Sequence, residues 1–314
     1  MDNTNDIKIS ENNKTNIYDN KIDNAKKKLN TSIDKVPDKK EKIILKNLVF
    51  GGGGVKGLAY IGLLKILYQH NLIKNLKVII GSSAGSLMAL AICLGYKCQE
   101  MIDYLMPFKL NRFINITAKS ILEFTKDYGL DKGDKLESFI KGAISYKGFS
   151  ENITLKQLYD ITKKHLIVTA SCIVNQQCFY LDYKTFPDMP LWLACRASCG
   201  LPILFKPVKY ENYLFIDGSI MDNTPLYKFK TEMENSVAFK FSCNKDLNNF
   251  VGYIRTIAHC FKNYDPNLEF DKNIVYIDST NVETVQMVDL PLLNDMMNNC
   301  IKATTEKFIE LNFI

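Results

Sequence analysis

Two stretches of sequence decide the fold: residues 43–57, IILKNLVFGGGGVKG, and residues 78–85, VIIGSSAG. In both, an apolar run with the pattern of a buried β-strand ends in glycine and other small residues, which favour a tight loop or turn. Apolar residues on a helical period follow the first loop, and a helix of small residues follows the second. The order of strand, loop, helix, strand, turn and helix predicts a parallel sheet covered by helices.

The rest of the chain continues this α/β pattern. Residues 101–164 predict a helical layer or lid, with helices at 136–143 and 155–162, the second opened by Thr154 as N-cap. Further strands are predicted at residues 166–169, 178–183, 214–216, 236–241 and 274–277. The sequence therefore predicts an α/β domain with a mostly parallel central sheet over residues 43–314.

Residues 1–42 have a different composition from this domain. They are rich in Asn, Lys and Asp, nearly lack aromatic residues and show no sustained helical or alternating period. Such a segment cannot bury enough apolar surface to offset the entropy lost on ordering. We therefore expect a disordered polar tail over residues 1–42.

Composition restricts the partners and the compartment. The nine cysteines include no CxxC pair and no zinc-type spacing with histidine, so we expect reduced thiols, no metal site and no cofactor. No secretory signal and no bilayer-spanning apolar run are visible, which favours a cytoplasmic protein that meets membranes only peripherally. The net charge of +6 is most simply a solubilising surface, and no basic stripe with interleaved aromatics points to nucleic acid.

The second stretch contains a candidate nucleophile. Gly81-Ser82-Ser83-Ala84-Gly85 fits the pattern G-x-S-x-G, in which small residues allow a strained strand-to-helix turn to expose one serine. That serine is Ser83. The backbone N–H groups at the start of the following helix would also favour developing negative charge. A structural serine turn is the alternative that the bare pattern leaves open.

The first glycine loop can serve the same chemistry. Its glycines, above all Gly53 and Gly54 with Gly52 beside them, can present backbone N–H groups to an oxyanion without an intervening side chain. Gly52, Gly54 and Gly57 also satisfy the dinucleotide fingerprint G-x-G-x-x-G. That fingerprint requires an acidic residue about 20 positions further on. Residues 58–85 contain no Asp or Glu, which disfavours nucleotide binding.

A serine nucleophile needs a general base, and two candidates exist. Asp217 ends the apolar run Leu214-Phe215-Ile216 and is followed by Gly218, so its carboxylate is expected at the carboxyl end of a strand. His259 would complete a Ser83, Asp217, His259 triad in the chain order of α/β-hydrolases. It lies, however, in a helix-like stretch without the loop context of such a base. Asp217 is therefore the preferred base.

Together these motifs resemble the patatin-like phospholipase family. Its glycine loop matches residues 52–57, its nucleophile elbow residues 81–85, and its acidic signature Asp217-Gly218. Residues 197–208, ASCGLPILFKPV, and residues 223–226, NTPL, resemble two further family segments. The resemblance covers roughly residues 45–226. Ser219 departs from the family, which usually has Gly or Ala at this position.

The resemblance implies a three-layer α/β/α fold and hydrolysis of lipid acyl esters by a Ser-Asp dyad without histidine. Ser83 would be the nucleophile and Asp217 the base, with an oxyanion hole at Gly52, Gly53 and Gly54. Gly57, Gly81, Gly85 and Gly218 would be motif positions. Lys56 would either favour an anionic lipid or face solvent. The implied partner is a phospholipid or another acyl-ester lipid.

A second interpretation keeps the fold but not the chemistry. On this interpretation the chain is a catalytically silent lipid-binding or scaffold protein. The two interpretations predict different outcomes with a probe for active serines, because only a hydrolase would be labelled at Ser83.

Overall fold

The computed structural model describes residues 41–107, 114–242, 253, 256–257, 266–279, 281–283 and 287–314. The expected tail over residues 1–42 lies almost entirely outside the described residues. His259, the base of the alternative triad, lies outside them as well.

Within the described residues, eight strands form one sheet in the order β10-β9-β1-β2-β4-β8-β7, and β5 also pairs with β4. The strands are β1 (Asn47–Phe50), β2 (Val78–Gly81), β4 (His165–Cys172), β5 (Gln177–Leu181), β7 (Val208–Tyr210), β8 (Tyr213–Asp217), β9 (Ser236–Phe241) and β10 (Ile274–Ile277). From β10 to β4 all neighbours are parallel, whereas β5, β8 and β7 join antiparallel. The mostly parallel α/β sheet is confirmed, but its antiparallel end was not predicted.

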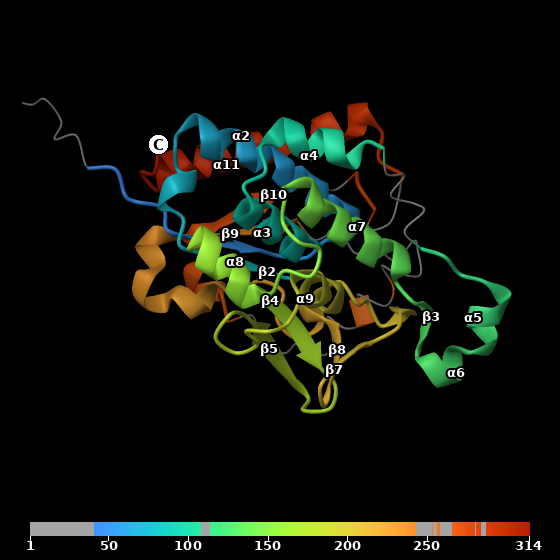
Figure 1. The fold of residues 1–314 in the computed structure, drawn as a ribbon. Helices are drawn as coiled ribbons and strands as arrows, with labels where there is room; N and C mark the ends of the chain where they lie inside the picture. Colours follow the sequence, from blue (N-terminus) through green and yellow to red (C-terminus); the bar gives the residue numbers. More distant parts are fainter. Residues whose placement is uncertain are drawn as a thin grey trace, which may run out of the picture. The chain divides into compact units, whose positions relative to one another are not determined.

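Helices cover both faces of this sheet (Figure 1). The larger core lies under α2 (Ile61–Gln69), α3 (Ala84–Leu94), α4 (Cys98–Leu105), α7 (Asp134–Tyr146), α8 (Leu155–Thr162), α9 (Leu191–Ser198) and α11 (Leu290–Glu310). The smaller core lies under the 3-10 segments η5 (Leu226–Asn235) and η6 (Leu268–Asn273). Strand β1 shows the division, because Leu48 and Phe50 belong to the larger core and Val49 to the smaller one. The expected three layers are therefore present.

The one predicted helix that was given an N-cap lies where the sequence placed it. Helix α8 has the predicted bounds, and the Thr154 side chain accepts a hydrogen bond from Gln157 N, as an N-cap should. The first helix is divided, since the 3-10 segment η1 (Gly54–Tyr60) precedes α2. A two-stranded sheet of β3 (Gly129–Asp131) and β6 (Ile203–Phe205) was missed. Its three-residue strands are too short for a periodic signal.

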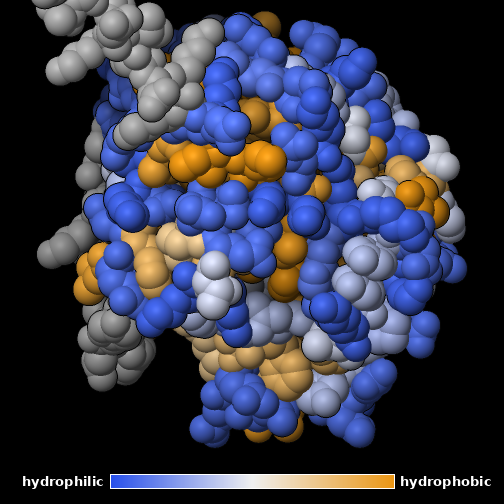
Figure 2. All heavy atoms as spheres, turned by 90° about the vertical axis from the view of Figure 1, so that its left-hand side faces the viewer, coloured by the Kyte–Doolittle hydropathy of each residue, from blue (hydrophilic) through white to orange (hydrophobic). Residues whose placement is uncertain are grey.

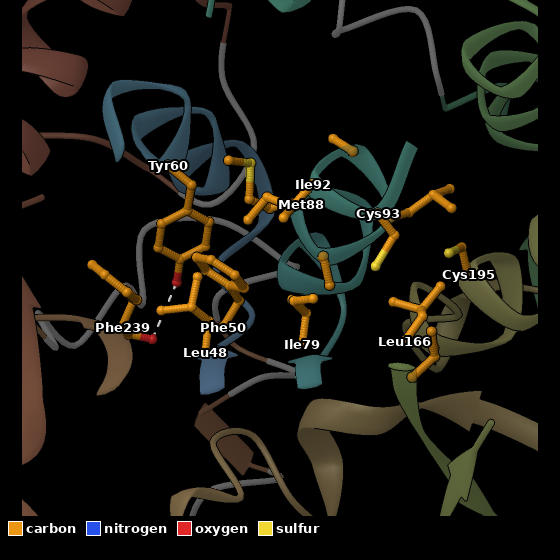
Figure 3. Close-up of a cluster of buried hydrophobic side chains, with 14 of the residues drawn as sticks. Leu48, Phe50, Tyr60, Ile79, Met88, Ile92, Cys93, Leu166, Cys195 and Phe239 are labelled. Atoms are coloured by element: carbon orange, nitrogen blue, oxygen red, sulfur yellow. Dashed lines mark hydrogen bonds between the residues drawn. The ribbon is translucent and has the colours of Figure 1, made fainter. Parts of the chain in front are cut away.

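An aromatic cluster holds the first glycine loop above the sheet (Figure 3). The rings of Phe50 and Phe239 stack with centroids 5.3 Å apart, and Tyr60 meets Phe50 edge-on at 5.1 Å. The buried Tyr60 hydroxyl donates to Gly51 O at 2.8 Å and lies 3.3 Å from Phe239 O. These contacts tie the start of the loop to the end of β1 and to β9.

Strands β2 and β8 run toward each other along one edge of β4. Gly81, the last residue of β2, pairs with Val168, and Asp217, the last residue of β8, pairs with Ala170. Strand β5 pairs with β4 at both positions, and therefore occupies the opposite edge. The carboxyl ends of β2 and β8 consequently meet across a single intervening residue of β4.

Candidate active site

Ser83 lies in a strained turn between β2 and α3. Its φ of 51° and ψ of −128° lie in a region that L-residues rarely adopt. A Cβ at Gly81 would lie 2.3 Å from Gly85 O, and a Cβ at Gly85 would lie 2.3 Å from Phe50 O. Both flanking glycines are therefore required by the close approach of β1, β2 and α3.

The turn brings Ser83 to Asp217. The Ser83 hydroxyl donates to Asp217 Oδ2 at 2.7 Å, and the carboxylate belongs to a residue that is only 3% exposed. The other oxygen, Oδ1, accepts from Ser219 N at 2.8 Å. Asp217 N donates to Gly200 O at 2.9 Å. Backbone contacts on both sides thus fix the orientation of this carboxylate.

The last residue of α9 and the segment that follows it contact both residues of this pair. Ser198 is fully buried and its Oγ accepts from Ser83 N at 2.8 Å, while Gly200 O holds Asp217 N. The sequence resemblance singled out this segment without giving Ser198 a role. Its partner is a backbone N–H 115 residues away, which no local pattern reveals.

The first glycine loop lies against the elbow. A Cβ at Gly52 would come within 2.7 Å of Ser83 Cβ, and Gly52 N donates to Asn223 Oδ1 at 2.7 Å. The N–H groups of Gly53 and Gly54 donate to no acceptor among the described residues. Asn223 is a second residue whose role the sequence did not reveal, because it too acts on a backbone N–H.

An apolar cavity of about 300 Å³ opens from this pair and the glycine loop. Its walls come mainly from α3, α4 and α7, with Leu204 and Phe205 of β6 at one side. Lys56 also lines it and is only 2% exposed, so the alternative of a solvent-facing lysine is wrong. The cavity combines a few polar groups at one end with a long apolar wall, as ligand pockets commonly do.

Cys199 lies beside the pair and lines the same cavity. Burial, and next the nearby charge of Asp217, raise the pKa of this thiol well above its ordinary value. The thiol therefore stays protonated at neutral pH, and a thiolate is not available to compete as nucleophile.

The two described histidines lie away from this cavity. His165 begins β4, pairs with Val78 at the amino end of β2, and has its Nε2 2.7 Å from Asp182 Oδ2. His70 is exposed after α2. Neither is among the residues that line the cavity.

Comparison with known families identifies the chain. A family model described as patatin-like phospholipase matches residues 48–230, which is more than half of the 314 residues. The chain belongs to the patatin-like phospholipase family. The match spans Ser83, Asp217 and both glycine segments.

Individual relatives agree with this assignment. The chain is 26% identical over 267 residues to the probable lipid hydrolase 463L of Invertebrate iridescent virus 6, covering 85% of each chain. It is 27% identical over 217 residues to triacylglycerol lipase 5 of Saccharomyces cerevisiae, covering 60% of this chain and 28% of the lipase.

Solved structures show the same fold. VipD from Legionella pneumophila superposes with a TM-score of 0.56 at 16% identity, covering 85% of this chain and 67% of VipD. The type III effector ExoU gives 0.50 at 14% identity, covering 86% of this chain and 54% of ExoU.

The buried hydroxyl of Ser198 predicts a measurable stability effect. In Ser198→Ala the Ser83 N–H loses its acceptor, which is expected to lower the free energy of unfolding by about 1–3 kcal/mol. Urea denaturation measures this loss. The control Ser138→Ala removes an exposed hydroxyl on α7 and is expected to stay within about 0.5 kcal/mol of wild type. Equal losses in both variants would contradict the assigned role of Ser198.

Proposed function

We propose that this chain hydrolyses acyl esters of lipids with Ser83 as nucleophile and Asp217 as general base. The observation that carries the proposal is the 2.7 Å hydrogen bond from Ser83 Oγ to Asp217 Oδ2 beside a long apolar cavity. A nucleophile in hydrogen-bond contact with a base that is itself held in place is the arrangement that nucleophilic catalysis requires. Family membership supports a lipid ester as the substrate.

The reaction takes place in two steps. Ser83 Oγ attacks the acyl carbon as its proton passes to Asp217, and Asp217 then protonates the departing alcohol, leaving an acyl-enzyme. Water attacks the acyl carbon in the second step and gives its proton to Asp217. The tetrahedral intermediate then collapses and releases the fatty acid, and Ser83 Oγ takes the proton back from Asp217.

The oxyanion formed in both steps needs donors. We assign the N–H groups of Gly53 and Gly54, and the positive end of α3 adds favourable electrostatics. Gly52 was also expected to be a donor of the oxyanion hole, but its N–H already donates to Asn223 Oδ1, so we do not assign it as a donor to the oxyanion. In this proposal Gly52 lets the loop approach Ser83, and Asn223 orients the loop.

The membrane contact expected from the sequence is assigned to the arm formed by residues 114–131. The arm contains α5 (Ala118–Leu122) and α6 (Phe124–Asp127), which lie outermost on the right in Figure 1. Its exposed apolar side chains are Ile116 at 47%, Ile121 at 59%, Leu122 at 83% and Tyr128 at 65%. Exposed apolar residues grouped in this way mark an interaction site.

The position of the arm favours a lipid surface as its partner. The arm starts at Ile114, which lines the cavity, and ends in β3, whose neighbour β6 supplies Leu204 and Phe205 to the cavity wall. Exposed lysines, Lys119 and Lys126, lie among the apolar residues, as anionic headgroups would favour. Hydrophilic residues dominate the face turned away from the arm, with apolar ones in separate patches (Figure 2). No helix among the described residues has the length and apolar character needed to span a bilayer.

Substitution of the pair tests the chemistry. Ser83→Ala and Asp217→Asn are each expected to lower kcat/KM for a p-nitrophenyl ester by at least about 10³-fold, because nucleophile and base act as one unit. Ser82→Ala is the matched control: Ser82 Oγ is buried and makes no hydrogen bond within the described residues, so activity should be retained.

A fluorophosphonate probe with mass spectrometry locates the reactive serine independently. The adduct is expected on Ser83 and absent from Ser83→Ala. A large loss of activity in His259→Ala would contradict the dyad of Ser83 and Asp217 and favour the triad that includes His259. Failure of folded wild-type protein to react, with or without lipid vesicles, would favour the silent lipid-binding protein.

Substitution in the arm tests the lipid contact. Leu122→Ser is expected to weaken binding to vesicles of mixed neutral and anionic phospholipid by roughly 10-fold or more, since burying a leucine contributes about 1.5–3 kcal/mol. Co-sedimentation measures the binding. The control Leu268→Ser removes a leucine that is 68% exposed on η6 and is expected to bind as wild type does. Equal binding by all three proteins would refute the assignment of the arm.

A further inference from the structure

The cavity follows α3 from one end to the other. Ala84, Leu87, Ala91 and Leu94 lie three or four residues apart on this helix and all line the cavity. Leu136, Ile140 and Ala143 form a matching row on α7. The cavity is therefore a channel between two helices, with Ser83 at the amino end of α3.

Tyr96 lines this channel just beyond the carboxyl end of α3. Gly95, with a φ of 77°, ends α3, and the next residue turns its side chain toward α7. The Tyr96 hydroxyl donates to Ala143 O at 2.7 Å, which joins the end of α3 to the last turn of α7. The residue is 2% exposed and lines the cavity.

Neighbouring groups hold the Tyr96 ring in this position. Tyr146 stacks on it with centroids 5.8 Å apart and planes 9° from parallel, and Lys147 Nζ lies 5.2 Å from its centroid. Tyr104 makes a similar link from α4, donating to Phe139 O at 2.7 Å. Burial, and next Tyr104 and Tyr146, raise the pKa of Tyr96, so its hydroxyl remains a donor at all physiological pH values.

We propose that Tyr96 sets the length of acyl chain that the site accepts, at about 12 carbons. This inference rests on the proposed function. The length follows from two features of the channel: it starts at the reacting serine, and a fixed side chain bars its other end.

The dimensions of α3 give the number of carbons. At about 1.5 Å per residue, its 11 residues span roughly 16 Å. Three bonds of an extended chain advance at most about 3.5 Å, so 16 Å accommodates roughly 13 bonds of an all-trans acyl chain. The cavity volume of about 300 Å³ is large enough to hold a chain of this length.

The test compares p-nitrophenyl esters with 4 to 18 carbons. Wild type is expected to show its highest kcat/KM near 12 carbons and a fall for 16 and 18. Each variant is judged by its ratio of kcat/KM for the 16-carbon ester to that for the 8-carbon ester, so a general loss of activity cancels.

Two substitutions are expected to move this ratio in opposite directions. Tyr96→Ala opens the end of the channel and should raise the ratio at least about tenfold, since each added methylene that becomes buried contributes favourably. Ala91→Phe places a ring seven residues beyond Ala84, about 10 Å along the helix, and should move the optimum to about 8 carbons.

Two further variants are the matched controls. Tyr96→Phe keeps the ring and is expected to keep the optimum within two carbons of wild type. Tyr68→Phe removes a hydroxyl that lies 3.4 Å from Gly95 O but lines no part of the cavity, and should keep the wild-type ratio. A wild-type optimum at 18 carbons, or an unchanged ratio in both Tyr96→Ala and Ala91→Phe, would overturn the inference.

Binding separates this inference from the proposed function. Displacement of a fluorescent fatty acid from Ser83→Ala by free fatty acids of 8 to 18 carbons needs no catalysis. If no ester is hydrolysed but the affinity for fatty acids peaks near 12 carbons and shifts with Tyr96→Ala, the inferred channel length is supported and the proposed hydrolase activity is refuted. If esters are hydrolysed without any dependence on chain length, the proposed hydrolase activity is supported and the inferred channel length is refuted.

Discussion

The meeting of β2 and β8 along one edge of β4 is the constraint on which the site depends. Residues 83 and 217 are separated by 134 positions, yet the paired strands leave their ends only one residue of β4 apart. An all-parallel sheet would not produce this, because its carboxyl ends lie on separate strands side by side. Because β8 runs antiparallel to β4, its carboxyl end points toward the turn that contains Ser83, and the Asp217 carboxylate therefore faces this serine.

That geometry leaves almost no space between backbones. Gly81, Gly85 and Gly218 each lie where a Cβ would come within 2.3 Å of another backbone oxygen. The elbow is also strained, and a non-glycine residue at such a φ costs on the order of 1–3 kcal/mol. Strain of this kind persists only when several contacts impose the same conformation. Ser198 on Ser83 N and the packing of α3 on β1 are two such contacts.

How far the sequence predicted the molecule depends on whether the signal was local. Strands β9 and β10 and helix α8 have the predicted bounds, because each is a continuous apolar or amphipathic run with clear ends. The elbow and Asp217 were likewise visible as short motifs. Strands β3, β6 and β7 have three residues each and carry too little pattern to detect. What the sequence did not reveal was the long-range pairing of residues.

Ser198 and Asn223 lie inside motifs that the resemblance recovered, but their partners are the backbone N–H groups of residues 83 and 52. A side chain that binds a distant backbone group produces no spacing rule in the sequence, so these roles could not be predicted.

Helix α3 joins Ser83, the proposed nucleophile, to the channel in one rigid element. Its amino end is fixed by Gly85 against Phe50 O, and its carboxyl end by the Tyr96 bond to Ala143 O. Its inner face, with Ala89 fully buried, packs on the sheet and cannot change size without moving the elbow. Within the described residues, the walls that can vary without disturbing Ser83 are therefore those of α4 and α7 and the cavity side of α3 beyond its serine end. On the proposed function, the acyl preference of this chain should accordingly depend on these walls and on Tyr96, whereas the serine end of α3 is held by backbone contacts that tolerate no added atom.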